Sequence, residues 1–137
     1  GNTIGPSPRE NEPEHIIKAL SMGFDVEVDV WYDKESFWLG HDEPQYQIEV
    51  GFLKEDRIWC HAKNVEAFGK LLSHDTHCFW HQRDDVVLTS KGYVWTYPGV
   101  ALIDNSICVM PERCSEQDLS KCVGICSDYI AISRGKH

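Results

Sequence analysis

The chain has 137 residues, an apolar fraction of 42% and a formal net charge of −9. This length and composition suit one domain with a hydrophobic core and exclude an intrinsically disordered chain. The acidic charge makes nucleic acid and anionic membranes unfavourable partners, and no apolar run approaches the roughly 18 residues of a transmembrane segment. We expect a cytoplasmic protein with reduced cysteines, because no signal segment is visible at the N-terminus.

The first predicted element is a helix that follows a loop rich in Gly and Pro. Asn11 is suited to cap a helix that starts near Glu12, with Pro13 in its first turn. Apolar residues then recur at helical spacing until Gly23, where the helix is expected to end.

Residues 24–32 alternate between apolar and mainly acidic side chains, which predicts a strand with two different faces. Glu27 and Asp29 share one face, about 6.5 to 7 Å apart at the usual rise of a strand. Both can therefore approach one hard divalent cation, such as Mg²⁺ or Ca²⁺. The alternative is that these acids form the solvated face of an antiparallel sheet.

A short apolar run at 37–40 comes next and ends at His41 and Asp42. It predicts a strand that places an imidazole at its end, where a proton-transfer group is useful. The alternative is a surface histidine with no catalytic role.

The remaining chain predicts one further helix, capped by Asn64 and running to Ser73, and several short strands. The expected helical turns are at 50–54 and 115–121. The expected strands are at 58–63, 77–82, 86–89, 93–96, 106–110 and 123–130.

Early strand–helix alternation favours parallel βα units, and the later strands leave little room for helices. We therefore expect an α/β fold, a small helix-depleted TIM-like (β/α) barrel over residues 1–130, followed by a polar tail at 131–137. An open α/β sheet is the competing architecture.

A local cluster of potential zinc ligands lies between residues 74 and 81. It contains His74, His77, Cys78 and His81. On a strand these side chains would sit far apart, so we favour structural or pocket roles over a zinc site.

The order of several motifs resembles a known family. GN, then EN at Glu10 and Asn11, then GFDVEVDVW and GHD, followed by HAKN, FWHQ, VWTYPG and CSDYI, resemble the glycerophosphodiester phosphodiesterase-like branch of the phospholipase-C-like barrels. The resemblance runs over about Gly1 to Ile130. It implies a TIM-like barrel whose first strand is missing from this chain.

The resemblance also implies roles for individual residues. Glu27 and Asp29 would hold the divalent ion, and His61 would replace the family's third carboxylate as a ligand, shifting the preference toward Mn²⁺ or Zn²⁺. His41 would be the general acid, and Lys63 would contact the phosphate. The other expected substrate-binding residues are Asn2, His81 and Trp95.

The implied activity is metal-dependent hydrolysis of a small phosphodiester, such as a glycerophosphodiester or a related phospholipid head group. The family's first catalytic histidine has no counterpart in this chain, so we expect a nearly inactive protein that still binds metal and phosphate. Two alternatives stay open: a non-catalytic relative that binds a phosphorylated ligand or a partner, and a small metal-binding domain without a barrel. The sequence does not predict an oligomeric state.

Overall fold

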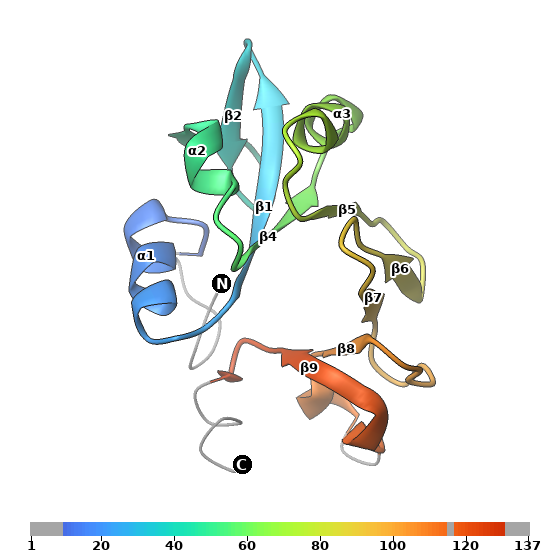
Figure 1. The fold of residues 1–137 in the computed structure, drawn as a ribbon. Helices are drawn as coiled ribbons and strands as arrows, with labels where there is room; N and C mark the ends of the chain where they lie inside the picture. Colours follow the sequence, from blue (N-terminus) through green and yellow to red (C-terminus); the bar gives the residue numbers. More distant parts are fainter. Residues whose placement is uncertain (1–9, 115–116, 131–137) are drawn as a thin grey trace.

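The computed structural model describes residues 10–114 and 117–130, and over these it contains two β-sheets and three α-helices (Figure 1). The helices are α1 (Pro13–Ser21), α2 (Val50–Leu53) and α3 (Val65–Ser73). The strands are β1 (Val26–Asp33), β2 (Ser36–Leu39), β3 (Tyr46–Ile48), β4 (Ile58–Ala62), β5 (Cys78–Trp80), β6 (Val86–Leu88), β7 (Val94–Thr96), β8 (Ser106–Val109) and β9 (Cys122–Cys126). No described helix is both long and apolar enough to cross a membrane.

The first sheet has the strand order β3-β2-β1-β4-β5, with β1, β4 and β5 parallel and the β1-β2-β3 pairs antiparallel. In the parallel pair, Glu27 lies beside Trp59 and Asp29 beside His61. Side chains at paired positions of parallel strands point to the same face. This register therefore brings the Asp29 carboxylate and the His61 imidazole together.

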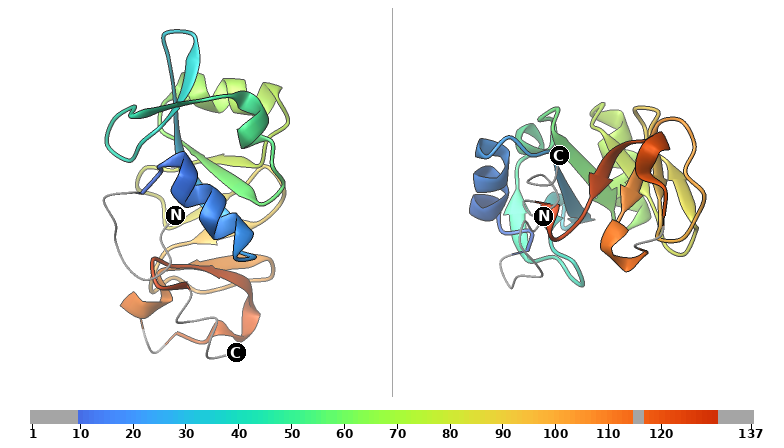
Figure 2. Two further views of the ribbon diagram at one scale, coloured as in Figure 1. Left: turned by 90° about the vertical axis from the view of Figure 1, so that its left-hand side faces the viewer. Right: turned by 90° about the horizontal axis from the view of Figure 1, so that it is seen from below.

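The second sheet has the order β6-β7-β8-β9, and only the β6–β7 pair is antiparallel. It curves back beneath the first sheet, so that β9 lies opposite the start of β1 (Figures 1 and 2). Helix α1 lies in front of β1 in the left view of Figure 2, and α3 packs against β1, β4 and β5.

The prediction of a TIM-like barrel is wrong, because the described strands form two open sheets and no closed barrel. A barrel needs a helix after each strand, but here β1 is followed by the antiparallel β2–β3 extension. The described residues that connect β6 to β9 contain no α-helix, and β5 and β6 belong to different sheets. The competing open α/β architecture is closer to the structure. The domain limits 1–130 and 131–137 stay a prediction.

The larger core lies around β1 and β4, whose apolar side chains are almost completely buried. Val28, Val30 and Ile58 each have no exposed surface. Asp29 on the other face is also buried, with 3% of its surface exposed. The alternative that Glu27 and Asp29 form the solvated face of an antiparallel sheet is therefore wrong for Asp29. The second sheet faces this side of β1 across a cleft.

Two predicted helix starts have different outcomes. Asn64 caps α3, because its side-chain oxygen accepts a hydrogen bond from the Ala67 backbone N–H at 2.9 Å. Asn11 does not cap α1: the N-cap residue is Glu12, which makes no side-chain capping bond. The predicted cap at Ser115 lies outside the described residues, and Asp118 caps a short 3-10 turn, Leu119–Lys121.

A smaller aromatic core joins the two sheets around Trp59, Phe79 and Trp95. His77 belongs to this region: its ring centroid lies 4.0 Å from that of Trp59, and its Nε2 lies 2.8 Å from the Thr89 hydroxyl. Burial, aided by the charge of Lys91, lowers the pKa of His77 to about 4.

The low pKa of His77 predicts a loss of stability in acid. The unfolded chain takes up this proton near pH 6.5, whereas the folded protein resists it until about pH 4. The contribution of His77 to the free energy of unfolding should therefore fall by up to about 3 kcal/mol between these values and change no further below them. Urea unfolding at a series of pH values measures this, with His77→Gln as the comparison. A variant with the same slope as the wild type in this window would contradict the assignment.

Candidate functional site

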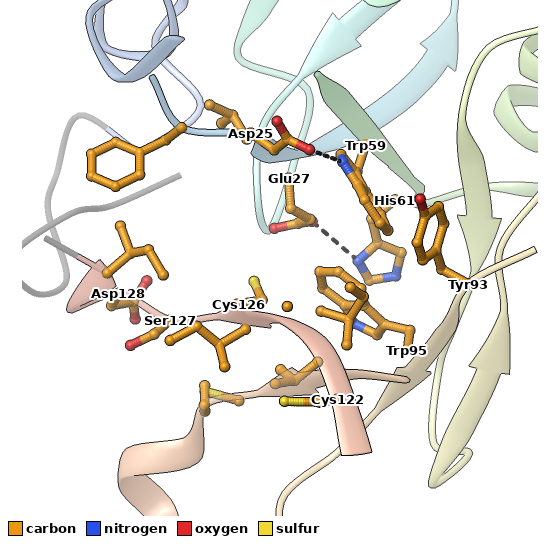
Figure 3. Close-up of a pocket in the computed structure, with 18 of the residues that line it drawn as sticks. Asp25, Glu27, Trp59, His61, Tyr93, Trp95, Cys122, Cys126, Ser127 and Asp128 are labelled. Carbon is orange, nitrogen blue, oxygen red and sulfur yellow. Dashed lines mark hydrogen bonds and ion pairs between the residues drawn. The ribbon is translucent and has the colours of Figure 1, made fainter. Parts of the chain in front are cut away.

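A cleft of about 990 Å³ lies between the two sheets and is lined by residues from both (Figure 3). One wall comes from β1 and β4 and carries Glu27, Asp29 and His61. The opposite wall comes from β9 and its continuation, including Cys126 and Asp128. The volume is at the upper end of the range of small-molecule sites.

Glu27, Asp29 and His61 converge on the β1–β4 wall. One ligand atom from each lies within 4.8 Å of the others. The His61 Nδ1 lies 3.3 Å from Asp29 Oδ1 and 3.7 Å from Glu27 Oε1. The predicted three-residue set is thus brought together, and no other described His, Cys, Asp or Glu group meets the same distance criterion.

The surroundings of His61 fix the orientation of its ring. The ring stacks on Phe79, with centroids 5.0 Å apart and an angle of 11° between the planes. Its Nε2 lies 3.1 Å from the backbone oxygen of His81. A carbonyl oxygen can only accept, so Nε2 carries a hydrogen and Nδ1 is the atom directed at the carboxylates.

Without an ion, the pKa of each of the three side chains is changed by at least one of the other two. Burial opposes protonation of His61, but hydrogen bonds to Asp29 and Glu27 outweigh it and raise the pKa of His61 to about 10. Burial alone would raise the pKa of Asp29, yet hydrogen bonds from His61 and Asn11 lower it. Burial and the neighbouring Asp29 raise the pKa of Glu27. The raised pKa of His61 therefore favours a protonated ring between the two acids in the ion-free protein.

The donor set fits a divalent cation. Two carboxylates and one imidazole suit Mn²⁺ or Zn²⁺, and with added water they also suit Mg²⁺. When Nδ1 loses its proton, the contact of Nε2–H with the His81 carbonyl leaves the Nδ1 lone pair facing Glu27 and Asp29. Metal-binding histidines commonly have their second nitrogen held in this way.

His41 lies at the rim of the same cleft. Its side chain is 60% exposed, and its Nδ1 donates to Asp42 Oδ1 at 2.9 Å. Because the carboxylate can only accept, the Nε2 atom is left for contact with a ligand.

Lys63 follows β4 directly, and its backbone N–H donates to Val30 at 2.8 Å. It is not among the cleft-lining residues. Its charge nevertheless helps to lower the pKa of Asp29, after the effects of burial and of the His61 and Asn11 hydrogen bonds. Lys63 thus acts on the site electrostatically.

Of the other predicted substrate-binding residues that the structure describes, one lines the cleft and one does not. Trp95 lines the cleft but is 5% exposed, and its Nε1–H donates to the Tyr97 hydroxyl at 3.1 Å. His81 is not a lining residue; its ring stacks on Tyr97 and its Nε2 lies 2.6 Å from the Asp84 backbone oxygen. Asn2 lies outside the described residues.

Sequence reasoning missed two residues that support the site. Asn11 was expected at the start of a helix but is hydrogen bonded to Asp29. Phe79 supports the His61 ring and also contacts Trp95, with ring centroids 4.9 Å apart. Phe79 is a buried aromatic in a short strand, and nothing in the neighbouring sequence indicates its role. Asn11 is a polar residue at the end of a loop, and it could have been considered as a hydrogen-bond partner of a strand.

The cluster of His74, His77, Cys78 and His81 does not form a zinc site, since it is absent among the described metal-competent groups. His77 contacts Thr89 and Trp59, and Cys78 is buried. These internal contacts fit a structural role for His77 and Cys78, and neither residue lines the cleft. All six cysteines are free thiols.

The chain matches no known family, no curated protein and no solved structure. The resemblance to glycerophosphodiester phosphodiesterases is therefore not supported, and the two open sheets also contradict the barrel that it implied. The candidate site rests on its own geometry.

Proposed function

We propose that the protein is a divalent-metal-dependent hydrolase of phosphodiesters. The observation that supports this proposal most is the convergence of Glu27, Asp29 and His61 on the wall of a cleft whose rim also carries His41. A metal-binding group beside a separate proton-transfer group is the minimum that metal-assisted hydrolysis needs.

Glu27, Asp29 and His61 would hold the ion, with Mg²⁺, Ca²⁺ or Mn²⁺ as the main candidates and Zn²⁺ as a further one. When bound, such an ion polarises phosphoryl oxygens and lowers the pKa of a coordinated water. Without an ion, the negative charge of the two carboxylates would repel a phosphate from the cleft. The positive charge of the ion is therefore needed for substrate binding.

The chain's own residues would do the remaining work. His41 Nε2, at the rim, would give a proton to the leaving alkoxide while Asp42 orients the ring. Lys63 would add positive potential near the phosphate. Among the described residues, His41 and His61 are the histidines at the cleft. With His61 assigned to the ion, the described lining of the cleft offers no second acid–base histidine, and we expect slow turnover.

The exposure of His41 favours one other function, which is binding of a phosphorylated ligand without turnover. Its side chain is 60% exposed and therefore not shielded from water. A group in bulk solvent is a weaker acid–base catalyst than one in a closed site. In that case the ion and the ligand would still bind.

The test is hydrolysis of bis(4-nitrophenyl) phosphate and of a glycerophosphodiester with Mg²⁺, Ca²⁺ or Mn²⁺. We expect turnover that EDTA abolishes and that His41→Ala lowers about 10²- to 10⁴-fold, the usual range for a general acid. The control is His74→Ala, because His74 lies in a different surface hollow beside Phe37. Ion and phosphate binding without turnover would support the non-catalytic alternative, and absence of ion binding would refute both.

A further inference from the structure

Asn11 is a polar residue in a fully buried position at the entrance to α1. Its side chain is among the largest fully buried ones, with 1% of the residue exposed. Its backbone is in the left-handed region, with φ at 65°. Asparagine tolerates this conformation better than most residues. The side chain does not cap α1 and instead faces β1.

The Asn11 amide binds Asp29 at two points. Its Nδ2 donates to Asp29 Oδ2 at 3.0 Å, and its Oδ1 accepts from the Asp29 backbone N–H at 2.9 Å. Pairing of β1 with β2 begins one residue later, at Val30. The Asn11 side chain thus takes the place that a strand partner would have at the Asp29 N–H, while the Asp29 carbonyl accepts from the Gly40 N–H at 3.2 Å.

This arrangement divides the two oxygens of the Asp29 carboxylate. Oδ2 is held by Asn11, and Oδ1 is directed at His61 Nδ1, 3.3 Å away. A carboxylate held at one oxygen and at its own backbone N–H has little freedom to rotate. The second oxygen therefore stays in position toward Glu27 and His61.

We propose that Asn11 is the positioning residue of the ion site, holding the Asp29 carboxylate in the orientation that binds the cation. This inference rests on the proposed function, because it assumes that the three-residue group takes an ion. Groups that orient metal ligands typically contribute about 10- to 100-fold to metal affinity when they are removed.

Asn64, the N-cap residue of α3, provides a control because its side chain also contacts β1. Its Nδ2 donates to the Tyr32 carbonyl at 2.9 Å and its Oδ1 accepts from the Tyr32 N–H at 3.2 Å. This is also a two-point contact, but both hydrogen bonds are made to the backbone of a residue outside the ion-binding group. Loss of Asn64 should cost stability without changing the ion site.

The experiment compares Asn11→Gly with Asn64→Gly by calorimetric titration with Mn²⁺, alongside thermal unfolding of each variant. Glycine accepts the positive φ of position 11, so backbone strain does not confuse the result. We expect the Kd for Mn²⁺ to rise about 10- to 100-fold in Asn11→Gly and to change less than about twofold in Asn64→Gly. Equal affinities in Asn11→Gly and the wild type would overturn the positioning role alone. Failure of the wild type to bind Mn²⁺ would overturn the proposed function, and the positioning role with it.

A second variant covers the case in which Asn11→Gly does not fold. Asn11→Asp keeps the shape and the acceptor for the Asp29 N–H, but it places a carboxylate against Asp29 Oδ2 and so turns that group away. We expect weaker Mn²⁺ binding despite the added negative charge. Tighter binding would mean that charge and not orientation controls the affinity, and it would contradict the proposal.

Discussion

Replacing Asp29 with asparagine should abolish ion binding while the fold persists. The substitution keeps the size of the side chain but removes the charge, and Asp29 is the member of the group that burial and hydrogen bonds enclose most completely. An amide also offers one oxygen where the carboxylate has two. We expect the Kd for Mn²⁺ to rise at least about 100-fold, together with loss of metal-dependent hydrolysis.

Thermal unfolding with and without Mn²⁺ gives an independent measure of the same prediction. A ligand at about 100 times its Kd stabilises the folded state by about 2.7 kcal/mol. The wild type should therefore unfold at a higher temperature with the ion, and Asp29→Asn should not. The control is Asp25→Asn, because Asp25 also lines the cleft but accepts a hydrogen bond from Trp59 Nε1 at 3.1 Å instead of joining the group. Asp29→Asn that binds Mn²⁺ as the wild type does would refute the site.

Gly40→Ala should both destabilise the protein and disturb His41. A Cβ at position 40 would overlap the backbone carbonyl oxygen of Glu43 and would lie 3.1 Å from the Gln45 nitrogen. Neither is the end of a flexible side chain, so the loop must move. Gly40 is also tied to the strands, since its N–H donates to the Asp29 carbonyl at 3.2 Å and its carbonyl accepts from Trp31 Nε1 at 2.6 Å.

We expect Gly40→Ala to lower the free energy of unfolding by about 2 to 4 kcal/mol, measured by urea unfolding. Any hydrolysis should fall as well, because His41 is the next residue. Gly69→Ala is the matched control: no atom lies within 4 Å of its added Cβ, and it is inside helix α3. That change should raise stability by about 0.5 to 1 kcal/mol. Equal changes in the free energy of unfolding for the two substitutions would contradict the predicted clash between the Cβ at position 40 and the Glu43 carbonyl.

The local elements and two of the three proposed ion ligands, Glu27 and Asp29, could be predicted from the residue pattern of the sequence. Alternation at 24–32 predicts β1 because a strand's side chains point to opposite faces in turn, and Glu27 and Asp29 share one face for the same reason. The structure puts β1 at Val26–Asp33 and α3 at Val65–Ser73, near the predicted bounds. His61 was added by a family resemblance that proved unsupported, yet the β1–β4 register does bring it to Asp29.

The arrangement of the sheets could not be predicted in the same way. Local periodicity does not say which strands pair, and the antiparallel β2–β3 extension and the break between β5 and β6 both depend on long-range contacts. The contact of Asn11 with Asp29 spans 18 residues. From sequence alone, the backbone N–H groups at the start of the adjacent helix were the expected partners of the Asn11 side chain, because they are close to it in the sequence. The assignment to a cytoplasmic compartment stays a prediction.

The most direct test of the ion site is a crystal structure of the protein soaked with Mn²⁺, with anomalous differences measured at the manganese edge. We predict one strong peak about 2.0 to 2.4 Å from a Glu27 oxygen, an Asp29 oxygen and His61 Nδ1. A map with no peak there, and with His61 Nδ1 still at ion-pair distance from both carboxylates, would show that the three residues form an internal ion pair and not a metal centre.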